Sequence, residues 1–372
     1  MIRGPMKATD AKDVSASART PAVTAEGETF PSDPKALRYT EIAAPAGGES
    51  VQIAPGVRWG RIPLPIDLNH INVWIIEAEG ASIVVDTGMA AAMGKDAWER
   101  IAQASFTTRP LRGVFVTHIH PDHIGLAAWL QERYEAPVWM SERTYRLAEA
   151  AVNGGSAFTV AESFFKANGL EDSAHMLPMF KPERFMRMTS GLPQVARFVR
   201  DDEPAPWSDA WRALETNGHA EGHLCLWNDS MRLLVSGDQV LPTISSNISF
   251  NFRSSDPNPL GSYLSSLVRL RELPRDTLVL PSHGAPFYGL HQRIDDLTRH
   301  HEEQLATVKR LCAAPQTAAQ LLPHLYRREL KGIHLFLALS EALAHVEYLV
   351  HAGRLEKRTT EEVVRYVALR SG

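Results

Sequence analysis

The feature that most constrains this chain is a polar cluster between an apolar run and a helical pattern. The run at 113–116 begins at a glycine and is otherwise β-branched and aromatic, which predicts a buried strand. Directly after it come Thr117, His118, Ile119, His120, Pro121, Asp122 and His123. From residue 124 to 134 apolar residues recur at helical spacing, which predicts a helix. The polar cluster is therefore expected where a strand ends and a helix begins.

This cluster has the composition of a metal site. On extended backbone, residues two apart face the same side, so His118 and His120 can converge on one point. Asp122 and His123 follow as the chain turns, and they can reach a second point beside the first. Imidazole and carboxylate groups together suit a borderline divalent metal such as zinc. A lone histidine would more often be a surface or hydrogen-bonded core residue, but the clustering favours a metal.

Strands and helices alternate along most of the chain, which predicts an α/β layered fold. Residues 1–50 are rich in Ala, Thr, Ser, Pro and Gly and predict a flexible lead-in. Residues 51–290 carry the alternation, and residues 291–372 predict a helical module that ends in a small β-hairpin, like a winged helix. The tail is interpreted as a packing or dimerisation element, with nucleic-acid binding as a weaker alternative because its charges nearly balance.

Residues 153–207 break the alternation and predict a helical insertion. Its aromatic and Met residues fit two interpretations equally: a small subdomain with its own apolar core, or a cap that lines an apolar substrate pocket. Candidate pocket residues are Phe158, Met179 and Phe180, together with Asn247 in a loop farther along the chain.

Composition limits the class of protein. The formal net charge of −4 over 372 residues gives no reason to expect a polyanionic partner. Cys225 and Cys312 lie far from any Cys or Cys/His motif and are interpreted as structural thiols in a reducing compartment. The first 14 residues have no apolar signal region, and no stretch is expected to span a membrane. A cytoplasmic protein is expected.

Further polar residues follow other predicted strands. Asp86 ends the run 82–85, and it either makes a local turn or orients a metal-binding histidine. His219 and His223 precede the strand 224–227, Asp238 follows 231–235, and His283 follows 277–280. In layered α/β folds that edge is where sites are built.

In this order, the motifs resemble those of the metallo-β-lactamase superfamily over about residues 50–290. The resemblance implies an αββα sandwich with a dinuclear metal site on the rim of its two sheets. By the family pattern, His118, His120 and His219 would hold the first metal. Asp122, His123 and His283 would hold the second, and Asp238 would bridge the two. Asp86 and His223 match positions that support the ligands.

The resemblance also implies a reaction, in which two divalent ions, zinc foremost with iron or manganese as alternatives, share a bridging hydroxide nucleophile. Asp122 would be the catalytic residue that orients the water and passes its proton to the leaving group. Asp238 argues against antibiotic hydrolysis, because β-lactamases of this fold typically lack the bridging carboxylate. The leading hypothesis is therefore a hydrolase of small thioesters, esters or lactones, near the hydroxyacylglutathione hydrolases.

Two other functions stay open at this point. The tail resembles that of β-lactamase-like protein 2, whose relatives include endoribonucleases, so a metal-dependent endoribonuclease is one alternative. The other is a non-catalytic regulator that binds a partner through its winged-helix-like tail. The complete set of ligand residues argues against it.

Overall fold

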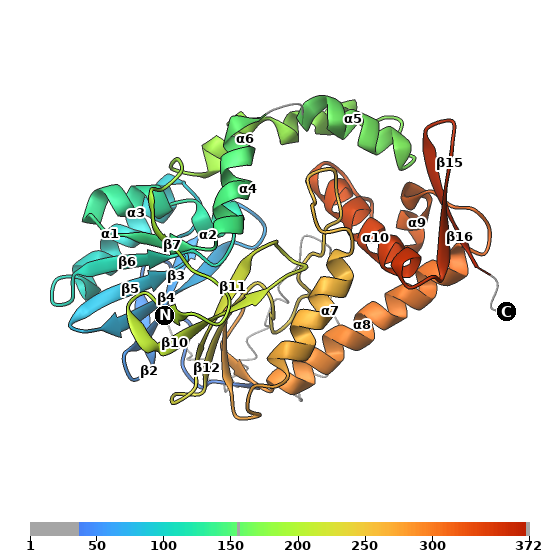
Figure 1. Cartoon of the computed structure of the whole chain (residues 1–372). Coiled ribbons are helices and arrows are strands. Elements are labelled where there is room, and N and C mark those ends of the chain that lie inside the picture. The colour runs from blue at the N-terminus through green and yellow to red at the C-terminus, as the bar shows by residue number, and fades with distance from the viewer. Residues whose placement is uncertain (1–36, 155–156, 370–372) are drawn as a thin grey trace, which may run out of the picture.

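The computed structural model of the chain describes residues 37–154 and 157–369 (Figure 1). The predicted strand and helix around the polar cluster are β6 (Leu111–Phe115) and α3 (Ala127–Tyr134), with the short helix α2 (Pro121–Ile124) between them. Most of the expected lead-in lies outside the described residues. Its described end differs from a flexible segment, because β1 (Arg38–Tyr39) pairs with β14 (Phe287–Tyr288) at a sheet edge.

The first sheet has seven strands in the order β2-β3-β4-β5-β6-β7-β8. Its first four strands pair antiparallel, and its last four pair parallel. Apart from β6, its strands are β2 (Ser50–Ala54), β3 (Val57–Pro63), β4 (His70–Ala78), β5 (Ala81–Val85), β7 (Val138–Met140) and β8 (Val195–Phe198).

The second sheet also has seven strands, in the order β1-β14-β13-β12-β11-β10-β9. Only β12 and β13 pair parallel. Its remaining strands are β9 (Pro204–Ala205), β10 (Ser208–Thr216), β11 (His223–Asn228), β12 (Leu233–Gly237) and β13 (Leu278–Pro281).

The two sheets lie face to face, with helices on both outer sides (Figure 1). The helix α1 (Ala92–Ser105) covers the first sheet together with α3, while α7 (Pro259–Leu270) and α8 (Leu290–Leu311) cover the second. Strand β4 shows why its apolar run is continuous. Its Ile71, Val73 and Ile75 face the helices, whereas Trp74 and Ile76 face the other sheet. The predicted αββα sandwich is confirmed.

One buried side chain links the two sheets. Asn72 of β4 accepts a hydrogen bond from Trp59 Nε1 at 2.8 Å. Its own amide nitrogen donates to the carbonyls of Pro281 (2.8 Å) and Gly284 (2.7 Å), at the end of β13. Because Asn72 is fully buried, these three bonds fix the turn at 281–284 against the first sheet.

The segment 153–207 differs from the predicted helical insertion at its C-terminal end. It follows α4 (Glu142–Asn153) and contains α5 (Ala157–Ala167), the 3₁₀ helix η1 (Ala174–Phe180) and α6 (Pro182–Met188). Residues 195–198 and 204–205 are instead β8 and β9, which extend the two sheets at their edges. The helical part therefore ends at residue 188, because the chain returns to pair with β7.

The helical part of this insertion packs against the C-terminal module. Phe180 is only 6% exposed and lies among Phe165, Phe252 and Phe336, with ring centroids 4.8–5.7 Å away. Phe336 belongs to α10 (Ile333–His351), so an aromatic cluster joins the insertion to the end of the chain. The insertion shares its core with the second half of the molecule, and Figure 1 shows α5 reaching across to that side.

The C-terminal module consists of α8, α9 (Ala318–Leu325), α10 and the hairpin β15 (Leu355–Thr360) and β16 (Val363–Ala368). Contrary to the expectation from sequence, α10 is long and apolar enough to cross a membrane. However, 61% of its apolar window is buried inside the protein, as in the core helix of a folded domain. The described part of the chain therefore has no convincing membrane span.

Replacing Asn72 by Leu is expected to lower the free energy of unfolding by at least about 3 kcal/mol. The substitution leaves the Trp59 indole N–H and two buried carbonyls without a partner, at about 1–3 kcal/mol for each buried group. Urea unfolding of the metal-free protein measures the loss. Asn153→Leu, at the exposed end of α4, is the matched control and should change stability by about 0.5 kcal/mol or less. Equal effects of the two variants would contradict the role of Asn72.

Phe180→Ala should destabilise the protein by about 3–5 kcal/mol, the usual cost of a phenylalanine-sized cavity. Hydrogen exchange should increase in α5 and near Phe336, since both lose the shared aromatic contact. Met186→Ala removes a side chain that is 43% exposed on α6 and serves as the control. If Phe180→Ala resembles this control, the aromatic cluster does not hold the insertion in place.

Candidate metal centre

Strand ends deliver the polar residues to one place. His118 and His120 follow β6, Asp122 and His123 lie in α2, and His219 lies in the turn before β11. Asp238 follows β12 and His283 follows β13. The structure brings them together as two groups that could each hold a metal ion: His118, His120, His219 and Asp238, and then Asp122, His123 and His283.

The first group has three imidazole nitrogens in mutual contact. His118 Nε2 lies 2.9 Å from His120 Nδ1, and His219 Nε2 lies 3.3 Å and 3.1 Å from these two atoms. A tetrahedral ion with bonds of about 2.0–2.1 Å to nitrogen places its ligand atoms about 3.3 Å apart. The spacing of the three nitrogens therefore fits a single ion.

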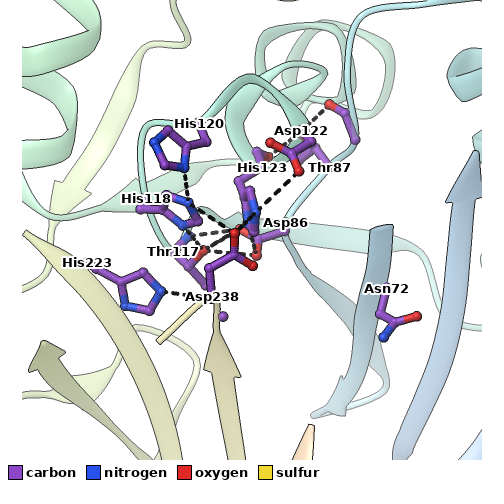
Figure 2. Close-up of polar contacts among 12 residues, drawn as sticks. Asn72, Asp86, Thr87, Thr117, His118, His120, Asp122, His123, His223 and Asp238 are labelled. Carbon is purple, nitrogen blue, oxygen red and sulfur yellow. Dashed lines mark hydrogen bonds and ion pairs between the residues drawn. The ribbon is translucent and has the colours of Figure 1, made fainter. Parts of the chain in front are cut away.

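The second group joins the first through Asp238. Asp122 Oδ2 lies 3.3 Å from His283 Nε2 and 3.7 Å from His123 Nε2. Asp238 Oδ2 lies 3.4 Å from both His123 Nε2 and His219 Nε2, and Asp238 Oδ1 lies 3.6 Å from His283 Nε2. Asp238 thus reaches both groups, and Figure 2 shows its carboxylate directed toward His118 and His123.

Three atoms at this centre are buried without a hydrogen-bond partner: His123 Nε2, His283 Nε2 and Asp238 Oδ1. Leaving buried polar atoms unpaired costs free energy, so natural proteins pair almost all of them. Atoms with free lone pairs that point at a common centre are what a cation requires. The residues of the centre therefore fit a dinuclear site.

Hydrogen bonds outside the two groups fix which nitrogen of each ring faces the centre. His219 Nδ1 donates to the carbonyl of Asn247 at 2.9 Å, and His283 Nδ1 donates to the carbonyl of His70 at 3.0 Å. His118 Nδ1 lies 3.0 Å from Thr117 Oγ1. With the proton held on Nδ1, each of these rings turns Nε2 toward the centre.

Asp86 orients the fourth such ring. It sits directly after β5 with a φ of 63°, a conformation that non-glycine residues rarely adopt. Its Oδ2 lies 2.8 Å from His123 Nδ1, and Oδ1 accepts the backbone N–H of Thr117 at 2.9 Å (Figure 2). Asp86 therefore ties β5 to the turn that carries the histidines, and it is more than a local turn residue.

His223 lies beside the centre but belongs to neither group. Its Nε2 accepts the backbone N–H of Asp238 at 3.2 Å, and its Nδ1 donates to Thr216 Oγ1 at 2.8 Å. Gly237 has a φ of 52°, and a Cβ there would come within 2.3 Å of His223 Nε2. His223 thus holds the turn that presents Asp238.

Burial dominates the electrostatics of His118 and His120. It lowers the pKa of His118 well below the usual range, and His123 and His120 lower it further. Burial and His219 lower the pKa of His120 to about 3. These rings stay neutral at physiological pH and keep a lone pair available, as metal ligands must.

The carboxylates stay charged. Burial raises the pKa of both Asp122 and Asp238, but His123 and His283 outweigh it and bring both pKa values below the usual range. Burial lowers the pKa of His123, but Asp86 and the two carboxylates raise it well above its usual value. Asp122 and Asp238 lie next to His123 and His283, whose pKa values the carboxylates raise despite burial, so a cation that binds here would replace the protons on these two imidazoles.

The structure places the expected pocket residues in different surroundings. Phe180 is part of the aromatic cluster, Met179 is half-buried beside it, and Asn247 contributes its carbonyl to His219. Phe158 lies in α5, but its side chain is outside the described residues. Sequence reasoning placed Thr117 in the polar cluster without giving it a role, and it missed the His70 carbonyl, whose contact to the centre has no signature in spacing.

Comparison with known proteins agrees with this geometry. A model of the metallo-beta-lactamase superfamily matches residues 66–283, and a model of the metallo-beta-lactamase-like C-terminal domain matches residues 305–369. The chain is 24% identical over 300 residues to the "probable metallo-hydrolase YqjP" of Bacillus subtilis (strain 168), covering 78% of this chain and 90% of that protein.

Two solved structures resemble the whole molecule. A beta-lactamase domain protein from Burkholderia ambifaria has a TM-score of 0.82 and 35% identity, covering 90% of this chain and 99% of that one. A metallo-beta-lactamase family protein from Thermus thermophilus has a TM-score of 0.73 and 27% identity, covering 86% and 100%. Because the superfamily model spans more than half of the chain and the architecture agrees, the chain belongs to the metallo-beta-lactamase superfamily.

Proposed function

We propose that this chain is a dinuclear metal-dependent hydrolase that cleaves a small thioester, ester or lactone. The observation that carries the proposal is the position of Asp238, which reaches donor atoms of both groups. His118, His120 and His219 would hold the first ion, and Asp122, His123 and His283 would hold the second, with Asp238 between the two groups. The names of relatives such as YqjP, a probable metallo-hydrolase, support a hydrolase but name no substrate.

Two divalent ions supply Lewis acidity and lower the pKa of water toward neutrality. The chain's own residues then act around them. Asp122 is ionised because His123 and His283 lower its pKa, so its carboxylate can orient a water and accept a proton. Asp122 would then return that proton to the leaving group. Asp86 and the Asn247 carbonyl hold two ligand rings in register while this happens.

An uncharged acyl substrate suits the surroundings better than RNA does. Ile119, between the two first ligands, and Phe250, in the loop after Asp238, are half-buried apolar residues that border the two cores, and they are the apolar contacts proposed for an acyl group. In the C-terminal hairpin, Lys357 pairs with Glu347 at 2.5 Å and Arg358 pairs with Glu356 at 2.7 Å. Paired basic residues offer little to a phosphate backbone. Zinc is the proposed metal, and the two free cysteines support a reducing, cytoplasmic location.

The purified protein should bind two divalent ions per chain, and chelation should lower its melting temperature. Binding to the folded state alone contributes about 4 kcal/mol when the free metal is about 1,000 times Kd. Elemental analysis after loading with zinc, manganese or iron(II) gives the stoichiometry and the preference. Asp238→Ala should hold fewer than two ions, whereas His324→Ala, on the exposed side of α9, should hold two. A wild-type protein that binds no metal would refute the proposal.

Hydrolysis of one class in a panel of acyl-thioesters, esters and lactones is expected from the metal-loaded protein. Asp122→Asn should lower kcat by about 10²–10⁴-fold, because the variant can no longer accept the proton. The double variant His118→Ala/Asp238→Ala sets the background. Activity no higher than this background would exclude acyl hydrolysis, and cleavage of single-stranded RNA in a parallel assay would favour an endoribonuclease instead.

A further inference from the structure

The turn that carries His219 is anchored by an acidic side chain two residues later. Glu221 Oε2 accepts from Arg143 Nε at 2.9 Å and also from Arg143 Nη2, which in turn donates to Ser255 Oγ. Glu221 Oε1 accepts the backbone N–H of Ser255 at 2.9 Å, and Ser255 Oγ donates to the same carboxylate. One carboxylate therefore joins three segments: α4, the His219 turn and the loop before α7.

Two hydrogen bonds connect the His219 turn to the segment 247–255. The segment 247–255 touches the His219 turn at two points: at its start, the Asn247 carbonyl accepts from His219 Nδ1, and at its end, Ser255 binds Glu221. The first contact turns the ring so that Nε2 faces the centre. The contact between Ser255 and Glu221 holds the segment 247–255 next to the His219 turn, so the Asn247 carbonyl stays within hydrogen-bond distance of the imidazole.

The His219 turn needs such an anchor because glycines lie on both sides of the histidine. Gly218 has a φ of 103° and Gly222 a φ of 73°, so the chain reverses at both ends of a short turn. Ser141 Oγ donates to the Gly222 carbonyl at 2.7 Å and holds that end. Between the glycines, Glu221 is the residue whose side chain reaches α4 and the loop before α7.

We propose that Glu221 is a positioning residue for the metal centre, which holds His219 and its Asn247 acceptor in register through Arg143 and Ser255. This inference rests on the proposed metal site. An exposed pair of Glu and Arg would contribute little. Here, however, the Glu221 side chain is only 21% exposed, and four donor groups from two other segments converge on it. Loss of a direct partner of a ligand histidine, here the Asn247 carbonyl, typically changes metal affinity by about 10–100-fold, and Glu221 acts through that partner.

Metal affinity and cobalt spectroscopy of the full-length chain test the role of Glu221. Glu221→Ala should weaken binding of the first metal equivalent by about 10–100-fold in a chelator competition. It should also change the visible absorption of the cobalt(II)-loaded protein, because the His219 ring moves. Glu221→Gln keeps an acceptor for the Ser255 N–H, so its metal affinity should lie between those of the wild type and Glu221→Ala. Arg143→Ala should also weaken metal binding. The double variant Arg143→Ala/Glu221→Ala should bind about as weakly as Glu221→Ala alone, since both substitutions disrupt the same contact.

The control is Glu203→Ala, which removes a 29% exposed carboxylate that also pairs with an arginine, Arg197, at 3.2 Å. Glu203 lies between β8 and β9, and its substitution should leave the metal affinity and the cobalt spectrum unchanged. Loss of the Glu221 contacts should lower the unfolding midpoint of the metal-free protein by less than the loss of metal affinity corresponds to.

Three outcomes would overturn the proposal. Glu221→Ala could bind metal as tightly as the wild type, or Glu203→Ala could weaken metal binding as much as Glu221→Ala does. The third is a metal-free unfolding midpoint of Glu221→Ala low enough to account for its loss of metal affinity. A wild-type protein that binds no metal would instead refute the metal site itself.

Discussion

The structure depends on one costly arrangement: seven histidine and aspartate side chains crowd into a largely buried centre. Imidazole nitrogens lie 2.9–3.3 Å apart, and three ligand atoms have no hydrogen-bond partner. Bound cations would stabilise such a centre, because they would compensate for the desolvated charge and give the unpaired atoms a partner. Much of the surrounding structure answers this demand. Strand ends deliver the candidate ligands, and Asp86, Thr117, His223 and two backbone carbonyls hold them in one orientation.

Local patterns in the sequence predicted a layered α/β fold and polar residues at several strand ends, whereas the αββα sandwich and the division of the ligands between two ions came from the family resemblance. His118 and His120 stand two apart after an apolar strand, and Asp238 and His283 each end another, so period and position alone suggest a shared edge. The supporting contacts could not be predicted in this way. Asn72 binds carbonyls more than 200 residues away, and the ring at His219 depends on the Asn247 backbone, whose role is independent of its side chain.

The role of the insertion at 153–207 also could not be predicted from the sequence. Its Met and Phe content suited both a substrate cap and a structural core, and composition cannot separate these. The structure places Phe180 against Phe336 of α10, so at this residue the aromatic side chain joins the insertion to the C-terminal module. The C-terminal module also contacts the loop after Asp238. There, Arg293 of α8 donates to the carbonyls of Leu241 (2.6 Å) and Ile244 (2.7 Å). The end of the chain thus supports the loop that orients His219.

The division of the ligands between the two sheets has a mechanical consequence. His118, His120, Asp122 and His123 follow the first sheet, whereas His219, Asp238 and His283 come from the second. Neither half contains a full set for either ion, since His219 completes the first group and His283 the second. Bound ions would therefore act as non-covalent cross-links between the two halves of the sandwich. In that state, opening the sheets and releasing the metals become a single event.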